Sequence, residues 1–337
     1  MNISRFYRTE TIEYNLEFLT PAFLGGADQN AELRTAPFKA ALRWWWRVLY
    51  GNSKTPEDLS KEERSIFGST EQGSLARISI IGQVPPVKTN GFPKGKSIPV
   101  SSNGKDFFIN ILDYLAYGVC SYDKEEKQNV YNRSHLDLGK KFVFSVSLPA
   151  KSKNEITTCL NGLFTFGSIG SRSRNGFGSL YAVNGLAQAT YSEPWTTASP
   201  VGYPTLNSRS KLFVTKQNYD TWEEALSEIG SAYRNARISL EKRHTFNRRG
   251  FVSRPIEHKS ERIPDNIRNQ RSPKQFILHV AKQKGKYSGR ILSLPVAFYE
   301  KDGQGEYNKV IEDMHSYLSK TMGEKTGEIL KLVEARP

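Results

Sequence analysis

One ordered run of secondary-structure patterns in the first half of the chain constrains its fold most. Four strand-like segments, either alternating apolar and polar or short and apolar, are interspersed with two segments that carry apolar residues at helical spacing. In chain order these segments are residues 12–19, 35–51, 77–84, 140–149, 154–168 and 179–186. The order β-α-β-β-α-β predicts an α+β fold of the ferredoxin-like (RRM-type) class, an antiparallel sheet with helices on one face.

The first of the two helical segments shows both a start and a stop signal. Thr35 is a suitable N-cap, Pro37 suits the first turn, and Gly51 is a typical end. At 100° per residue one face is apolar and is predicted to be buried, and its members are Phe38, Ala41, Leu42, Trp45 and Leu49. Trp44 and Trp46 flank this face.

The second half shows further strand and helix patterns. They fit strands at 211–215, 275–281 and 290–299, and helices at 221–243 and near 307–321. Residues 105–119, in the first half, fit a strand or a helix equally well. We predict a tandem architecture, with an N-terminal ferredoxin-like domain over 1–190, a linker over 191–210, and a second ferredoxin-like module with a basic insertion over 211–337.

Positive charge is concentrated in one part of the second half. The chain has 48 Lys or Arg and 34 Asp or Glu, a formal net charge of +14. Residues 241–290 hold 14 Lys or Arg against four Asp or Glu, a surplus of ten. Phe246, Phe251 and Ile263 interrupt this segment, and a strand pattern ends it, which favours a folded nucleic-acid surface over a loose tail.

Composition excludes several other classes of protein. No run approaches 18 consecutive apolar residues, and the first residues lack the apolar core of a secretory signal, so we expect a soluble, cytoplasmic protein. Two cysteines, Cys120 and Cys159, cannot build a disulfide framework or a zinc site by themselves. We expect neither a metal nor a cofactor.

A glycine-rich stretch, FGSIGSRSRNGFGSL over 166–180, is the first candidate site. Its glycines allow close approach of a ligand to the backbone, and its amides could hold phosphate oxygens. Its site residues are predicted to be Gly167, Gly170, Arg172 and Arg174. The stretch is not a Walker loop, because no Gly-Lys-Ser/Thr follows, and a flexible hairpin is the alternative interpretation.

A basic ridge on the first helix is the second candidate site. Lys39, Arg43 and Arg47 are spaced by four on the side opposite the apolar face, and Arg34 precedes them. The ridge either follows a phosphate backbone or is simply the solvated face of an amphipathic helix. From the basic segment we add five further phosphate-binding candidates, namely Arg248, Arg249, Arg254, Arg268 and Arg271.

Three stretches together resemble a known family. FLTPAFLGGADQNAELRTAPFKAALRWWWR (18–47), IFGS (66–69) and the glycine-rich stretch are similar to the RAMP superfamily of CRISPR-associated RNA-binding proteins. More narrowly, they resemble the family of the first-numbered subunit of the type III-B (Cmr) effector complex. RSPKQFILHV (271–280) is similar to a strand in that family's second half, and Ala40 replaces a glycine found in many relatives.

The resemblance implies a function in antiviral defence. Such a subunit sits at one end of the complex beside other RAMP subunits, holds the 3′ part of the guide (CRISPR) RNA, and contacts the target RNA paired there. The candidate residues above are then RNA-binding residues, and no membrane partner is expected.

We expect a non-catalytic protein. His135 with Asp137 lacks a nucleophile and is interpreted as a surface pair, and no other catalytic pattern is present. One alternative is a guide-RNA-processing endonuclease of the same superfamily that uses His244 or His258. The other is a stand-alone RRM-like protein, which needs exposed aromatic side chains on its strands, for which the candidates are Phe142, Phe144, Phe177 and Tyr181.

Overall fold

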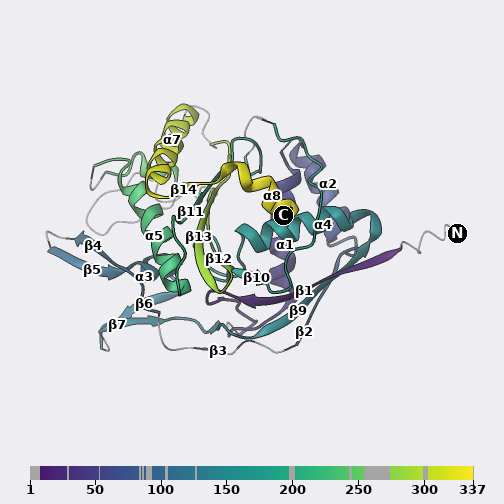
Figure 1. Cartoon of the computed structure of the whole chain (residues 1–337), viewed down its shortest axis with the longest axis horizontal. Helices are drawn as coiled ribbons and strands as arrows, with labels where there is room; N and C mark the ends of the chain where they lie inside the picture. Colours follow the sequence, from purple (N-terminus) through teal and green to yellow (C-terminus); the bar gives the residue numbers. More distant parts are fainter. Residues whose placement is uncertain are drawn as a thin grey trace.

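Two four-stranded antiparallel sheets form the centre of the structure. The structure is a computed structural model that describes residues 8–28, 30–52, 54–82, 85, 87–88, 93–102, 105–125, 127–196, 202–242, 245–253, 274–298 and 303–336. Figure 1 shows the second sheet standing between α5 and α7 on one side and α1, α4 and α8 on the other. Among the described residues, no helix is both long and apolar enough to cross a bilayer.

The N-terminal sheet has the strand order β10-β1-β9-β2, the order of a ferredoxin-like fold. Its strands are β1 (Thr9–Phe18), β2 (Arg77–Gly82), β9 (Lys141–Pro149) and β10 (Leu180–Ala182). Its two crossover helices are α1 (Thr35–Tyr50) and α4 (Lys153–Phe166). Tyr14 of β1 lies opposite Phe144 of β9, and both are buried because alternate side chains point to the helices.

The second sheet repeats the same topology. Its strand order is β12-β13-β11-β14, formed by β11 (Lys211–Val214), β12 (Phe276–Gln283), β13 (Lys286–Ser293) and β14 (Gly323–Glu324). The helices are α5 (Trp222–Ile238), which Thr221 and Glu224 begin with a capping box, and α7 (Gln304–Thr321). The predicted tandem ferredoxin-like fold is confirmed, although β13 begins before residue 290 and α5 ends at Ile238.

The structure corrects one local prediction and settles two points that the sequence pattern left open. The N-cap of α1 is Arg34, whose side chain makes no cap bond, and Thr35 is already the first helical residue. Trp46 is buried like Trp45, because α1 packs against α4 as well as the sheet. The ambiguous residues 105–119 divide into strand β5 (Lys105–Asn110) and helix α3 (Ile111–Ala116), which Asn110 caps.

Shorter elements fill the connections. Helix α2 (Pro56–Phe67), capped by Thr55, was not predicted. Further strands pair β3 (Val87–Lys88) with β8 (His135–Leu136), β4 (Ser97–Ser102) with β5, and β6 (Cys120–Asp123) with β7 (Gln128–Tyr131). The remaining helical turns are η1 (Ala150–Ser152), η2 (Arg249–Phe251), η4 (Thr326–Glu328) and α8 (Ile329–Glu334).

Helix α4 is the centre of the packing between the two halves. Every side chain from Ile156 to Phe166 is buried, because α4 contacts α1, α8 and strands of both sheets. The side-chain amide of Asn161 donates to the carbonyl oxygen of Val333 in α8, at 2.9 Å. Part of the predicted linker, including Thr205, Leu206 and Asn207, is also buried, and Leu206 N–H donates to Val48 O of α1 at 2.7 Å.

Candidate nucleic-acid interface

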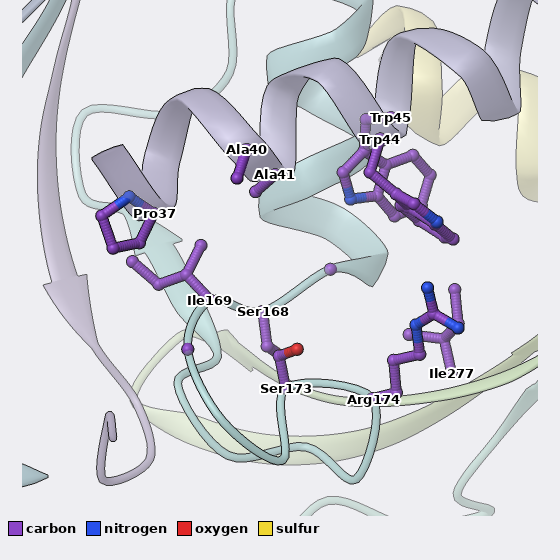
Figure 2. Close-up of a pocket in the computed structure, with 12 residues that line it drawn as sticks. Pro37, Ala40, Ala41, Trp44, Trp45, Ser168, Ile169, Ser173, Arg174 and Ile277 are labelled. Carbon is purple, nitrogen blue, oxygen red and sulfur yellow. The ribbon is translucent and has the colours of Figure 1, made fainter. Parts of the chain in front are cut away.

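A groove of about 300 Å³ separates α1 from the glycine-rich loop, residues 167–178. Figure 2 shows Pro37, Ala40 and Trp44 on the helix side, with Ser168 and Arg174 facing them from the loop. The groove lies at the boundary between the two halves of the chain, since Ile277 of the second sheet also lines it. Two sequence candidates, α1 and the loop, are therefore brought together.

Arg174 places a positive charge inside this groove. Its guanidinium carbon lies 5.0 Å from the centroid of the Trp44 ring, and its Nη1 donates to Lys274 O at 3.2 Å. Burial, followed by the positive charge of Arg47, lowers the pKa of Arg174 below its ordinary value. The group stays cationic at neutral pH, because an arginine keeps its proton in proteins.

The glycine-rich loop is folded onto both halves of the chain. Gly178 N–H donates to Pro21 O at 2.9 Å, and Ser171 N–H donates to Phe23 O at 3.0 Å. On the other side Leu278 N–H of β12 donates to Arg174 O at 3.2 Å. These bonds argue against the flexible-hairpin interpretation and fix the position of both loop arginines.

The glycines in this loop serve internal packing rather than ligand approach. A Cβ at Gly167 would lie 2.4 Å from Trp45 Nε1, and one at Gly178 would lie 2.0 Å from Ile169 O. Gly178 also has a φ of +73°, which favours glycine. Internal packing and backbone conformation therefore account for Gly167 and Gly178, and ligand approach at these positions stays a prediction.

Four basic side chains form a cluster that we call the basic seam, made of Arg172, Arg174, Lys274 and Arg237. Lys274 Nζ donates to Arg174 O at 3.2 Å and to the side chain of Asn175. Burial lowers the pKa of Lys274 well below its ordinary value, and the charges of the three seam arginines lower it further. No carboxylate among the described residues forms an ion pair with any of the four.

Neighbouring polar and aromatic groups hold the seam cations. Arg237 Nη1 donates to the hydroxyl oxygen of Tyr114 at 2.7 Å. Lys274 Nζ and the guanidinium carbon of Arg237 lie 4.9 and 5.7 Å from the centroid of the same Tyr233 ring. Arg172, with a φ of +61°, is exposed and extends over Gly118. These contacts position the charges without neutralising them.

Other predicted cations are neutralised within the chain. On α1, Arg43 Nε and Arg47 Nη1 each lie 2.6 Å from a carboxylate oxygen of Glu63, which is only 6% exposed. In the basic segment, Arg248 pairs with Glu306 at 2.9 Å and Asp313 at 2.8 Å, and Arg249 pairs with Glu241 at 3.0 Å. Charges paired in this way attract phosphate less strongly.

The remaining candidates fall into two groups. Arg34 Nη2 donates to Gly25 O at 2.6 Å and so holds the Gly-Gly turn, whereas Lys39 is half-buried on α1 without an ion pair in the described structure. Arg254, Arg268 and Arg271 lie outside the described residues. Sequence reasoning missed Lys274 and Arg237 as site residues, although both belong to patterns that it had identified.

The histidines give no exposed catalytic group among the described residues. His135 is 2% exposed and its ring centroid lies 4.4 Å from that of Tyr131, so its interpretation as a surface residue is wrong. Burial lowers the pKa of His279 to about 3 and that of His315 to about 4, which leaves both neutral at physiological pH. His244 and His258 lie outside the described residues.

Comparisons with known proteins identify the family of the chain. Residues 15–181, which include α1 and the glycine-rich loop, match the family model of the RAMP superfamily. The CRISPR system Cmr subunit Cmr1-2 of Pyrococcus furiosus is 32% identical over 181 residues, 50% of this chain and 92% of that protein. The chain belongs to the RAMP superfamily.

Within the superfamily, the chain resembles the Cmr1 subunits. Subunit Cmr1-1 of the same organism is 28% identical over 181 residues, 52% of this chain and 48% of that protein, so the match spans about half its length. The crystal structure of apo Cmr1 from Pyrococcus furiosus aligns with a TM-score of 0.52 and 20% identity, covering 94% of this chain and 98% of that one. This likeness shows a shared fold.

Proposed function

We propose that the chain is a non-catalytic RNA-binding subunit of a type III-B CRISPR RNA-guided complex. In this proposal it holds the 3′ part of the guide RNA and the target RNA paired there, beside other RAMP subunits. The basic seam carries the proposal, because its three arginines have no carboxylate partner among the described residues and need an external polyanion to neutralise them. The proposal also keeps the domain division at residues 190 and 210.

Removing the two loop arginines is the direct test. We expect Arg172→Ala with Arg174→Ala to weaken binding of single-stranded RNA at least about tenfold, because two phosphate contacts are lost. The slope of log affinity against log salt concentration should become shallower by about 1.4, at roughly 0.7 per lost contact on a single strand. Fluorescence anisotropy with labelled RNA measures both quantities.

A charge-matched control separates the seam from net charge. Lys309 and Lys331 are exposed and lie on α7 and α8, outside the seam, so Lys309→Ala with Lys331→Ala removes the same charge. The free energy of unfolding should change by less than about 1 kcal/mol in both double variants. If the two variants bind RNA equally well, the seam is not the binding site.

The stand-alone RRM alternative loses its main support. Phe142, Phe144 and Phe177 are all at most 1% exposed, so three of the four aromatic side chains that it requires cannot stack on bases. Phe144 instead packs against Phe38 of α1, with ring centroids 5.0 Å apart.

The endonuclease alternative leads to a separate prediction. Among the described residues, no group of three or more His, Cys, Asp or Glu is placed to hold a metal ion. Of the described histidines named above, His135 and His279 are buried and His315 is half-buried. We expect the purified chain to leave guide and target RNA intact, with or without Mg²⁺. Denaturing gel electrophoresis of end-labelled RNA measures this. Site-specific cleavage that His244→Ala with His258→Ala abolishes would overturn the non-catalytic proposal.

A further inference from the structure

A second cavity, of about 330 Å³, opens beside Arg237 of the basic seam. It lies between α3, the carboxyl end of α5, β4 and the turn η2, and its lining residues are Val100, Tyr114, Arg234, Arg237, Ile238 and Arg249. The match to the superfamily model covers Val100 and Tyr114 but ends at residue 181, so the three arginines of the cavity lie outside it. Three of its six lining residues are arginines, which is unusual for a cavity in a folded chain.

The three arginines are held in different ways. Arg249 pairs with Glu241, and Arg234 Nη2 donates to Pro99 O at 3.2 Å. Arg237 forms no ion pair with a described residue, and its Nη1 is bonded to the Tyr114 hydroxyl at 2.7 Å. Its Nε–H is buried and has no hydrogen-bond acceptor among the residues that the structure describes. A buried donor without an acceptor is rare in native proteins and indicates a partner that comes from outside the chain.

A phosphate group fits these donors. The guanidinium fork matches two phosphate oxygens, and the bonds are strengthened by charge. If the Arg237 side chain rotates while it keeps its contact with Tyr114, its unbonded Nε–H would donate to a phosphate oxygen. The carboxyl end of α5 disfavours an anion slightly, but the arginine charges nearby are larger than the partial charge of a helix end.

The rest of the cavity suits the remainder of a nucleotide. Val100 and Ile238 give it an apolar wall, and Ile238 is 41% exposed, so it is open to an apolar contact from a ligand. The Tyr114 ring adds an aromatic surface. The volume is at the lower end of the range of small-molecule sites, where a single nucleotide belongs.

We propose that this cavity binds one nucleotide of an RNA strand, with its phosphate on Arg237 and Arg234 and its ribose and base against Tyr114, Val100 and Ile238. This rests on the proposed function in one respect, since the nucleotide belongs to the strand that crosses the basic seam. In this proposal the cavity holds one nucleotide at a fixed place on a surface that elsewhere binds phosphates by charge alone.

Calorimetric titration of the full chain with three probes tests the cavity itself. We expect uridine monophosphate to bind more tightly than either uridine or inorganic phosphate. Only the monophosphate contacts both the arginines and the apolar and aromatic wall of the cavity. Arg237→Lys keeps the charge of the seam but removes the forked donor, and should weaken binding of the monophosphate at least about tenfold. Lys309→Gln is the control and should leave it unchanged. Inorganic phosphate binding as tightly as the monophosphate, or an unchanged Arg237→Lys variant, would overturn the proposal.

RNA-binding titrations of the same variant show whether the nucleotide belongs to an RNA strand or is free. Arg237→Lys should also weaken binding of single-stranded RNA while leaving the salt slope unchanged, unlike the loss of Arg172 and Arg174. If the monophosphate is lost but RNA affinity is unaltered, the occupant is a free nucleotide and the strand assignment is wrong. If the wild-type chain binds no RNA, the proposed function fails, and the monophosphate result still decides the cavity.

Folding of the variant is checked by its melting temperature. Arg237→Lys keeps a cation in place, and Tyr114→Phe removes only the hydroxyl that positions it, so both should melt within a few degrees of the wild type. Tyr114→Phe should weaken the monophosphate less than Arg237→Lys, since it loosens the guanidinium without removing it. The opposite order would contradict the assignment of the phosphate to Arg237.

Discussion

Affinity for single-stranded RNA is expected to fall about a thousandfold as salt rises from about 10 mM to about 250 mM. The three arginines of the basic seam, at about 0.7 counterions released per phosphate on a single strand, give a slope of about −2.1 in log affinity against log salt. Among the described residues, Arg174 and Arg237 donate to a carbonyl and a hydroxyl oxygen rather than to carboxylates. Their attraction for phosphate is therefore large at low salt and is screened as salt is added.

Anisotropy titrations at five or six salt concentrations, with RNAs of unrelated sequence, measure this slope. We expect the RNAs to differ in affinity by much less than the salt effect, because phosphate contacts carry no sequence information. A salt-independent affinity, or strong preference for one sequence, would contradict backbone binding and favour base recognition in the groove beside Trp44.

The largest loss of stability is expected for Trp45→Ala, at about 3–5 kcal/mol in the free energy of unfolding. Trp45 is 1% exposed, and its ring lies nearly parallel to that of Phe166, with centroids 6.3 Å apart. Gly162 and Gly167 of α4 and its cap leave space for the ring, since a Cβ at Gly162 would lie 2.8 Å from it. Removing the indole therefore leaves a cavity that rigid backbone cannot close.

Urea denaturation of Trp45→Ala and Trp44→Ala compares two adjacent residues of the same type. Trp44 is half-buried at the groove, so Trp44→Ala should lower the free energy of unfolding less than Trp45→Ala does. Trp44→Ala should also remove the contact with Arg174. RNA affinity should respond in the opposite order once both variants are folded. Equal destabilisation by the two substitutions would mean that Trp45 is not the side chain that joins α1 to α4.

The arrangement of strands and helices could be predicted because it depends on local periodicity. Alternation along residues 12–19 and 140–149 places every second side chain on the buried face, and β1 and β9 follow these limits closely. Helix α2 was missed although Thr55 and Pro56 form a normal helix start, because its apolar residues are few.

The charges of the site could be predicted only in part, because pairing depends on tertiary contacts. Arg43 and Arg47 have the spacing of a phosphate-binding ridge, but their partner Glu63 lies on the helix that was missed. Lys274 joins the glycine-rich loop across about 100 residues of sequence. No local pattern indicates such a contact, so the site had to be identified from the three-dimensional arrangement.

The contact between α4 and α8 also bears on how the chain is made. Asn161 and Val333 are 172 residues apart, yet the bond between them closes one side of the first core. The ribosome releases α4 well before it synthesises α8. During that interval, the apolar face of α4 that α8 later covers is exposed to solvent. The N-terminal half should therefore depend on a chaperone or on slow translation during synthesis, and it should complete its folding only after residues 329–334 emerge.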